Sequence, residues 1–261
     1  MLLAINVNNT NVKFAIYDHD RVAGQWRIAA DPARTADEYA VWLTHLMGLK
    51  DLTPDNISDA IIAIVVPQAL FEIKVLCRTY FGCDPLVIGE GKVNLGIDVL
   101  IDRPEEAGAD RLVNAVAGHG LYGGPLIVVD FGTATTFDIV GEDGSYIGGV
   151  IAPGINLSVE ALHVAAAKLP RIAIERPAHV IGKSTVEAMK SGVYWGYVGL
   201  VEGLITRIRA EHGRDDMKVL VTGGLAPLFA GATEVFDEVD PDLTMKGLLM
   251  IHQRNVASEG G

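Results

Sequence analysis

The sequence contains few of the features that mark secreted, zinc-binding or membrane-spanning proteins. Only two of its 261 residues are cysteines, Cys77 and Cys83, and they form no C-x-x-C pair. This argues against a disulfide framework or a thiolate zinc site and favours a reducing compartment. No apolar run approaches 18 residues, and the first residues lack the basic and apolar regions of a signal peptide. We therefore expect a cytoplasmic protein that does not enter a membrane.

Positive charge is also scarce. The chain has 21 lysines and arginines against 33 aspartates and glutamates, which gives a net charge of −12. A chain this acidic, without a basic stretch, is a poor candidate for binding nucleic acid or an anionic membrane surface. The net charge does not exclude a local site for one small anion. Glycine is abundant, with 29 residues, and this indicates many tight turns or close backbone contacts.

Short β-branched runs alternate with segments of helical periodicity. The expected strands are 2–7, 12–18, 60–67, 85–89, 126–132, 135–140 and 219–224. Capping boxes at 35–38 and 184–187 predict two helix starts, the second opening a long helix to about Glu211. A third helix is expected after Pro104, ending near Gly118. This mixture of strands and helices predicts an α/β sheet protein.

A weak internal repeat predicts two similar domains. Residues 2–28 and 126–151 share the order strand, polar turn, strand, turn and strand, and Asn6 and Asp130 take matching places after the first strand. Two such units predict a duplicated fold with a cleft between its halves; coincidence between two ordinary hairpins is the alternative. The expected domains are residues 1–118 and 119–261.

Two polar turns could bind phosphate. The turns from Asn6 to Asn11 and from Asp130 to Thr136 each follow an apolar strand. Both offer backbone N–H groups and hydroxyls, the donors of an anion-binding nest. An ordinary hairpin loop is the alternative for the first turn, since asparagine suits turns. Facing each other across a cleft, the two turns would hold a nucleotide.

Two further motifs have both a structural and a functional interpretation. The run Gly108-Ala109-Asp110-Arg111 could supply a general base and an anion-binding arginine, or only a first-turn acid and a surface ion pair. The pair Gly223-Gly224 follows a strand. It would allow either close approach of a flat ligand or a sharp turn.

Four glycines, Gly192, Gly196, Gly199 and Gly203, recur on one face of the long helix. Each glycine inside a helix costs about 0.8–1 kcal/mol relative to alanine, so the four cost about 3–4 kcal/mol. A close contact along this face would offset that cost. The contacting element could belong to the same chain or to a second copy in a dimer.

In this order, the motifs resemble those of type III pantothenate kinases. The resemblance runs from Met1 to about Asn255 and rests on N-N-T-N, P-E-E-x-G-A-D-R-L-V-N-A, V-D-F-G-T-A-T-T-F-D, G-G-x-I-A-P-G, T-V-E-A-M-x-S-G and V-T-G-G. It implies duplicated actin-like ATPase (ribonuclease H-like) domains and a homodimer. It also implies transfer of the γ-phosphoryl group of ATP to pantothenate, the first step of coenzyme A synthesis. A divalent ion such as Mg²⁺ and a monovalent cation, K⁺ or NH₄⁺, would be required.

The resemblance also implies roles for individual residues. Asp110 would accept the proton of the pantothenate hydroxyl, and Asp130 would hold the monovalent cation. The residues implied to line the pantothenate pocket with Asp110 are Gly108, Ala109, Arg111 and Thr185. The residues implied to bind ATP are Asn6, Val7, Asn8, Asn9, Thr10, Asn11, Val12 and Lys13 around the phosphates, Thr133 on a phosphate, and Gly223 and Gly224 near the adenosine.

The first turn departs from the usual family pattern D-x-G-N-T. Asn8 replaces glycine, and asparagine is among the residues most tolerant of a positive φ. Asn6 replaces aspartate, so it keeps the shape of the side chain without the charge that would face Mg²⁺ or its waters. Losing one charge-assisted interaction costs about 1.5–3 kcal/mol, which corresponds to a rate loss of about tenfold to over a hundredfold.

Three hypotheses follow from these residues. The first is a pantothenate kinase, either fully active or slowed by Asn6. The second is a catalytically impaired paralogue that acts as a binding or regulatory protein. The third is a kinase or hydrolase of the same superfamily that acts on a different substrate.

Overall fold

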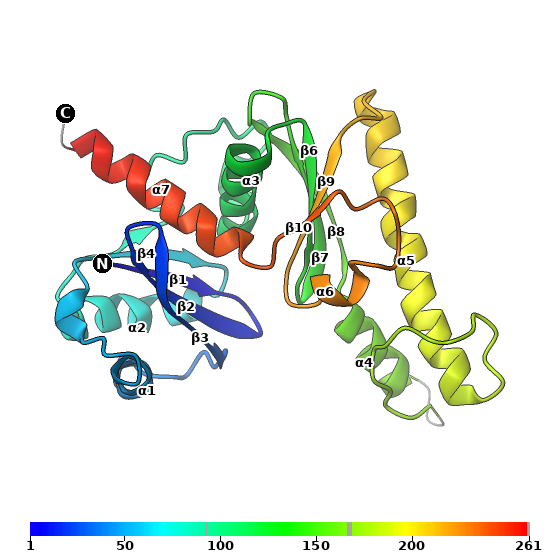
Figure 1. Cartoon of the computed structure of the whole chain (residues 1–261), viewed down its shortest axis with the longest axis horizontal. Helices are drawn as coiled ribbons and strands as arrows, with labels where there is room; N and C mark the ends of the chain where they lie inside the picture. The colour runs from blue at the N-terminus through cyan, green and yellow to red at the C-terminus, as the bar shows by residue number, and fades with distance from the viewer. Residues whose placement is uncertain (92, 166–168, 260–261) are drawn as a thin grey trace. The chain divides into compact units, whose positions relative to one another are not determined.

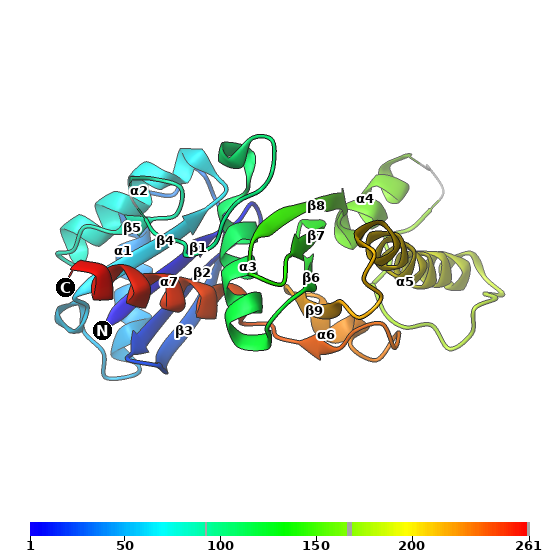
Figure 2. The same ribbon diagram turned by 90° about the horizontal axis from the view of Figure 1, so that it is seen from above.

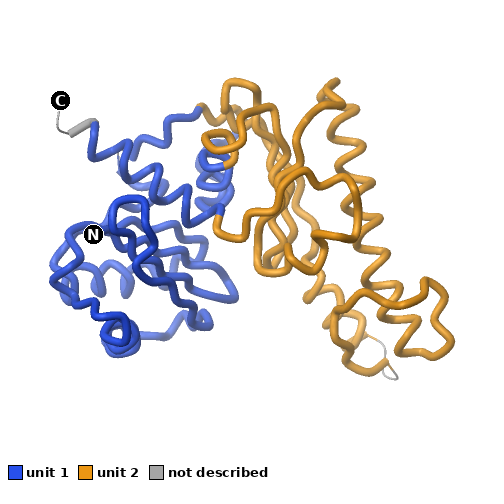
Figure 3. The backbone as a smooth tube through the Cα atoms, in the orientation of Figure 1, with its two compact units in different colours: residues 1–97, 102–117, 243–261 blue, residues 98–101, 118–242 orange. Residues whose placement is uncertain are grey.

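The computed structural model describes residues 1–91, 93–165 and 169–259, which form two compact units (Figure 3). Unit 1 contains residues 1–97, 102–117 and 243–261, and unit 2 contains residues 98–101 and 118–242. The last helix, Leu243–Glu259, makes its contacts in unit 1 and is therefore part of that unit. A division of the sequence at residue 118 would place it in the second half. The assignment of functional domains to 1–118 and 119–261 stays a prediction.

Unit 1 is built on a five-stranded mixed sheet (Figure 1). Its strands are β1 (Leu2–Val7), β2 (Asn11–Asp18), β3 (Arg21–Ala29), β4 (Asp59–Ile64) and β5 (Leu86–Val87), in the spatial order β3-β2-β1-β4-β5. Strand β1 pairs antiparallel with β2 and parallel with β4. The expected strand over 85–89 is shortened to two residues, because it pairs only with Ile61 and Ile62 at the sheet edge.

Helices cover both faces of this sheet. They are α1 (Ala36–Gly48), α2 (Leu70–Val75), the first part of α3 (Ala109–Tyr122) and α7 (Leu243–Glu259), with short turns at Pro54–Asn56, Pro67–Ala69, Leu76–Tyr80 and Pro104–Glu106. Alternate residues of β1 point to opposite faces. Leu3, Ile5 and Val7 pack in the core with α1 and α2. Leu2 and Ala4 pack in the core with α3 and α7.

Helix α7 is fixed closely on α3 (Figure 2). A Cβ atom at Gly247 would lie 2.6 Å from Val113 Cγ1, so only glycine allows this approach. The buried Thr244 hydroxyl donates to Asn114 Oδ1 at 2.7 Å. Further along α7, Met245, Leu248 and Ile251 are buried in the core that covers β1 and β4. A segment more than 180 residues away in sequence therefore completes the core around the first strand.

Unit 2 repeats the topology of unit 1. Its strands are β6 (Leu126–Phe131), β7 (Ala134–Val140), β8 (Tyr146–Pro153), β9 (Lys218–Thr222) and β10 (Glu238–Val239), in the spatial order β10-β9-β6-β7-β8. Strand β6 pairs antiparallel with β7 and parallel with β9, as β1 does with β2 and β4. The predicted duplication and the α/β fold class are confirmed.

The helices of unit 2 are α4 (Ile155–Ala165), α5 (Thr185–His212), α6 (Ala226–Phe229) and the end of α3. The long helix α5 begins where its capping sequence predicts, with the Ser184 hydroxyl accepting a hydrogen bond from Glu187 N at 3.3 Å. Its buried side chains include Tyr197, Val201 and Ile205, which pack with Phe131 and Phe137 of the sheet. None of the helices in the described residues combines the length and apolarity that a bilayer crossing requires.

The expected end of α3 at Gly118 was wrong, because the helix continues to Tyr122. Gly118 lies inside the helix at a point of close packing, where a Cβ atom would be 3.2 Å from Leu126 Cδ1 and Val128 Cγ2. The glycine permits contact with the unit 2 sheet and does not act as a stop signal. The helix does follow Pro104 as expected, but it does not begin at once, since Pro104 opens a separate 3₁₀ turn and α3 begins at Ala109.

Candidate functional site

Two buried side-chain oxygens, at the end of β1 and in the turn after it, have no hydrogen-bond partner among the described residues. Asn8 N donates to Asn11 O at 3.0 Å and closes the turn. The side chain of Asn6 is only 3% exposed, and its Oδ1 atom has no hydrogen-bond partner within the described chain. Asn8 Oδ1 is likewise buried without a partner there. A buried acceptor left unpaired costs about 1–3 kcal/mol. Both oxygens are therefore available to a donor or an ion that the protein itself does not supply.

Asp110 lies in the first turn of α3, on the same side of the unit 1 sheet as Asn6. Ala63 is the register partner of Asn6, and Ala109 packs in the same core as Ala63. Asn6 and the start of α3 therefore share one face of unit 1. In that position Asp110 Oδ1 accepts a hydrogen bond from Arg111 N at 2.9 Å.

Burial raises the pKa of Asp110, against the opposing effects of the Arg111 backbone hydrogen bond and the Arg111 charge. Desolvation disfavours the ionised form and makes the carboxylate more basic than an ordinary surface aspartate. A group of this kind, partly exposed at the start of a helix, is suited to accept a proton from a bound hydroxyl. The neighbouring residues Gly108, Ala109 and Arg111 are also partly exposed.

The turn after β6 carries the second set of predicted residues, in unit 2. Gly132 N donates to Ala134 O at 3.0 Å and closes the turn that contains Thr133. Asp130 is in register with Thr136 on β7 and Thr222 on β9. Paired residues of adjacent strands point to the same face, so a threonine lies on each side of the carboxylate. The sequence analysis did not single out Thr222, because the pairing of β9 with β6 is a long-range contact.

Gly223 has a structural reason to be glycine. Its φ is +96°, and a Cβ atom there would lie 2.6 Å from Phe131 N, next to Asp130. A side chain would therefore displace the backbone that carries Asp130. Gly224 is exposed, with no atom within 4 Å of an added Cβ. The two glycines thus differ: packing against Phe131 requires glycine at position 223, whereas the surface around Gly224 is open.

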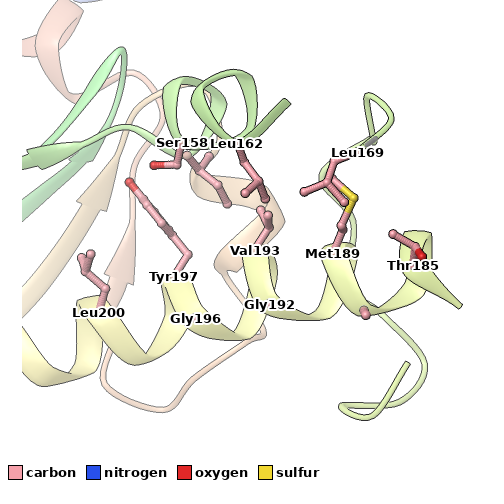
Figure 4. Close-up of a pocket in the computed structure, with 12 residues that line it drawn as sticks. Ser158, Leu162, Leu169, Thr185, Met189, Gly192, Val193, Gly196, Tyr197 and Leu200 are labelled. Carbon is pink, nitrogen blue, oxygen red and sulfur yellow. The ribbon is translucent and has the colours of Figure 1, made fainter. Parts of the chain in front are cut away.

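Thr185 belongs to a different unit from the other residues predicted to bind pantothenate. It is the first residue of α5 in unit 2, whereas residues 108–111 belong to unit 1. Thr185 lines an open, largely apolar pocket of about 590 Å³ between α4 and α5. Figure 4 shows Leu162, Met189 and Tyr197 around this pocket. None of the other predicted site residues lines it.

The two units share one strand order, and each has a polar turn after its first strand. This arrangement is the fold shared by actin-like ATPases and sugar kinases. A family model described as type III pantothenate kinase matches residues 2–207. The chain belongs to the type III pantothenate kinase family.

Individual relatives agree with this assignment. A type III pantothenate kinase from Paramagnetospirillum magneticum is 63% identical over 98% of each chain. One from Rhodospirillum rubrum is 60% identical over 98% of this chain and 99% of its own.

Solved structures share the fold at low sequence identity. A putative Baf family transcriptional activator from Campylobacter jejuni has a TM-score of 0.62 at 17% identity, covering 98% of this chain and 99% of its own. The activator of 2-hydroxyisocaproyl-CoA dehydratase from Clostridium difficile, solved with bound ADPNP, has a TM-score of 0.58 at 14% identity. It covers 99% of this chain and 96% of its own. At these identities the likeness concerns the fold alone.

Proposed function

We propose that this chain transfers the γ-phosphoryl group of ATP to the primary hydroxyl of pantothenate, forming 4'-phosphopantothenate for coenzyme A biosynthesis in the cytoplasm. Besides the family membership, one observation carries the proposal. Asp110 is a desolvated carboxylate at the start of α3, on the sheet face that carries the first polar turn. Pantothenate and ATP are the partners; neither nucleic acid nor a membrane is needed.

Asp110 acts as the general base in this proposal. Its raised pKa favours uptake of the proton from the attacking hydroxyl. The hydrogen bond from Arg111 N fixes the orientation of its carboxylate. Gly108, Ala109, Arg111 and Thr185 line the pantothenate pocket, and the positive charge of Arg111 complements the carboxylate of pantothenate.

ATP binds to the two polar turns. Residues 6–13 cradle the phosphates through backbone N–H groups and the charge of Lys13, and Thr133 contacts a phosphate from the second turn. Gly224 provides open surface for the adenosine, beside Gly223. Phosphoryl transfer depends on positioning and charge stabilisation, and rigid turns on strand ends provide the positioning.

The residues present fit two ions of different kinds. In the described parts of the chain, no three His, Cys, Asp or Glu side chains could together hold a metal ion. Mg²⁺ would therefore be held mainly by phosphates and waters, with the unpartnered oxygens of Asn6 and Asn8 facing it. When bound, it neutralises phosphate charge. Asp130, between Thr136 and Thr222, offers the oxygen ligands that suit K⁺, or acceptors for NH₄⁺.

The purified chain is expected to form 4'-phosphopantothenate from ATP and pantothenate with Mg²⁺ and K⁺. The product is measured by mass spectrometry, with a reaction lacking pantothenate as the control. Absence of product from both the natural chain and its Asn6→Asp variant would contradict the proposal. If the chain phosphorylated a sugar or another acid in preference to pantothenate in a substrate panel, a kinase with a different substrate would be favoured.

The impaired-paralogue hypothesis has one observation in its favour. The buried position where the family usually has aspartate holds an amide, and its oxygen is unpartnered within the described residues. Calorimetry separates this hypothesis from the kinase. Pantothenate binding without turnover supports a binding or regulatory protein, whereas turnover excludes it.

The glycine face of α5 supports a homodimer. Gly192, Gly196 and Gly199 are exposed, and no atom of the described chain lies within 4 Å of an added Cβ at any of them. The intrachain contact considered from the sequence is therefore not made at these three residues. Val164 on α4 and Ile181 before α5 are 74% and 83% exposed. Exposed apolar groups are typical of a protein–protein contact, and a second copy of this chain is the proposed partner.

Replacing Gly196 with leucine is expected to weaken dimerisation at least tenfold, because the side chain would separate the two helix faces. The measurement is sedimentation equilibrium over a concentration series. Gly48→Leu in α1 is the matched control, since an added Cβ there also meets no atom within 4 Å. A monomeric natural chain, or a Gly196→Leu variant that dimerises normally, would contradict the proposed interface.

A further inference from the structure

Two cations lie directly opposite each other beside the first polar turn. In the unit 1 sheet, Asn6 is in register with Lys13, and Lys13 is in register with Arg27. Opposed residues of an antiparallel pair point to the same face, with Cβ atoms about 4.5–5.5 Å apart. Asn6, Lys13 and Arg27 therefore form one row across β1, β2 and β3, on the face that also carries the start of α3.

The backbone around Arg27 holds it in this row. Trp26 packs in the core on the α1 side together with Phe14, its register partner. Alternation along the strand then directs Arg27 to the opposite face. Ala30 N donates to Thr10 O at 2.9 Å, which ties the end of β3 to the polar turn. The position of Arg27 is therefore set by packing on one side and by the turn on the other.

No anionic group of the described chain compensates these two charges. Neither Lys13 nor Arg27 forms a side-chain hydrogen bond or an ion pair with a described residue. Like charges directly opposite each other destabilise a sheet. The chain has 33 acidic residues, and at the other end of the same strand Arg21 is opposite Asp18. The uncompensated pair beside the turn is thus a local exception in an acidic protein.

We propose that Arg27 binds a phosphate of ATP together with Lys13, as a phosphate-binding residue outside the 6–13 turn. The inference rests on the proposed binding of ATP phosphates by residues 6–13, which lie on β1, β2 and the turn between them, and adds a third strand, β3, to that site. Arginine presents a planar fork of donors that matches two phosphate oxygens, and this geometry is stronger than a single point charge. The ligand class is the polyphosphate end of a nucleotide, so nucleotides with more phosphates gain more from Arg27.

The test compares three variants by calorimetry with ATP, ADP and AMP. Arg27→Gln is expected to weaken ATP binding at least tenfold and to change AMP binding no more than about twofold. Arg27→Lys is expected to restore part of the ATP affinity, because it keeps the charge without the fork. Arg21→Gln, on the same strand opposite Asp18, is the matched control and is expected to bind ATP normally. Both arginines are exposed, so Arg21→Gln and Arg27→Lys should melt close to the natural chain. Arg27→Gln removes the like charge opposite Lys13 and should melt at no lower temperature than the natural chain.

The outcomes separate this inference from the proposed function. Normal ATP affinity in Arg27→Gln, in a chain that phosphorylates pantothenate, overturns the inference alone; Arg27 would then only protect the exposed edge of β3 from pairing. Arg27-dependent ATP binding without phosphorylation of pantothenate supports the inference and overturns the proposed function. Failure of the natural chain to bind ATP overturns both.

Discussion

Replacing Asp110 with asparagine is expected to lower kcat for pantothenate phosphorylation by about 10²–10⁴-fold, the usual contribution of a general base. Asparagine has nearly the same shape and can accept the hydrogen bond from Arg111 N, but it cannot take up the substrate proton. ATP binding should remain, since Asp110 is not placed against the nucleotide. The measurements are steady-state kinetics and calorimetry with ATP.

Glu106→Gln is the matched control for this change. Glu106 lies four residues earlier, exposed in the turn before α3, and forms a surface ion pair with Arg103 at 2.8 Å. Loss of this ion pair should leave kcat within about twofold of the natural value, because exposed ion pairs contribute little. If Asp110→Asn kept more than a tenth of the natural kcat, Asp110 would not be the base.

The pH dependence follows from the raised pKa of Asp110. The base must be ionised, so kcat/KM should fall on the acid side at a higher pH than for an ordinary aspartate. A pKa raised in the folded state gives stability that is present below the unfolded-state pKa and lost as pH rises through the folded-state pKa. At neutral pH the ionised carboxylate therefore destabilises the fold. Asp110→Asn should melt at no lower temperature than the natural chain, which separates loss of the base from unfolding.

Replacing Asn6 with aspartate is expected to raise kcat about tenfold to over a hundredfold, the equivalent of about 1.5–3 kcal/mol. The side chain is 3% exposed and its oxygen is unpartnered within the described residues, so a carboxylate of the same shape would direct its charge to bound Mg²⁺ and phosphate. Asn56→Asp is the control, because it makes the same chemical change in the turn at Pro54–Asn56, far along the chain from the site.

The relative rates of the natural chain and the Asn6→Asp variant decide between the first two hypotheses. If the kcat of the natural chain is within tenfold of the kcat of the variant, asparagine at position 6 supports catalysis and the chain is an ordinary kinase. Turnover by the variant alone identifies an impaired paralogue. A thermal melt gives an independent readout, since a buried, uncompensated carboxylate destabilises the fold. The variant should melt below the natural chain without ligand, and Mg²⁺ with ATP should reverse the difference.

Local patterns predicted the helices α1, α3 and α5 and most of the strands of this fold, but not α2, α4, α6, α7 or β10. Long-range contacts decided what local patterns could not predict. The runs Leu2–Val7 and Leu126–Phe131 identify the first strand of each unit, because their nearly continuous apolar character is a property of adjacent residues. Gly118 was misjudged as a helix end, since its role depends on Leu126 and Val128 in another element. The place of α7 in unit 1 is likewise absent from its own sequence, because it depends on contacts with β1 and β4.

The candidate site divides in the same way. Asp110 and Asp130 stand in motifs through which the family resemblance implies a role for each, and these roles stay predictions. Thr222 and Arg27 do not, because nothing near Arg27 in sequence reveals that it faces Lys13. Strand register is fixed by turn geometry and by the buried face of the whole sheet. Residues contributed across strands therefore become visible only when the pairing is known.

The closure of the first core by α7 has a consequence for how the protein is made. A ribosome releases β1 and β4 more than 170 residues before Met245, Leu248 and Ile251 emerge to cover them. Unit 2 lies almost entirely between these segments, so its 118–242 stretch is complete first. The later unit in sequence can therefore fold during synthesis, while the earlier one keeps an apolar sheet face only partly covered, by α3, until the last helix arrives. Such long-range closure is slow and leaves nascent chains open to aggregation, so this face is where a chaperone would bind.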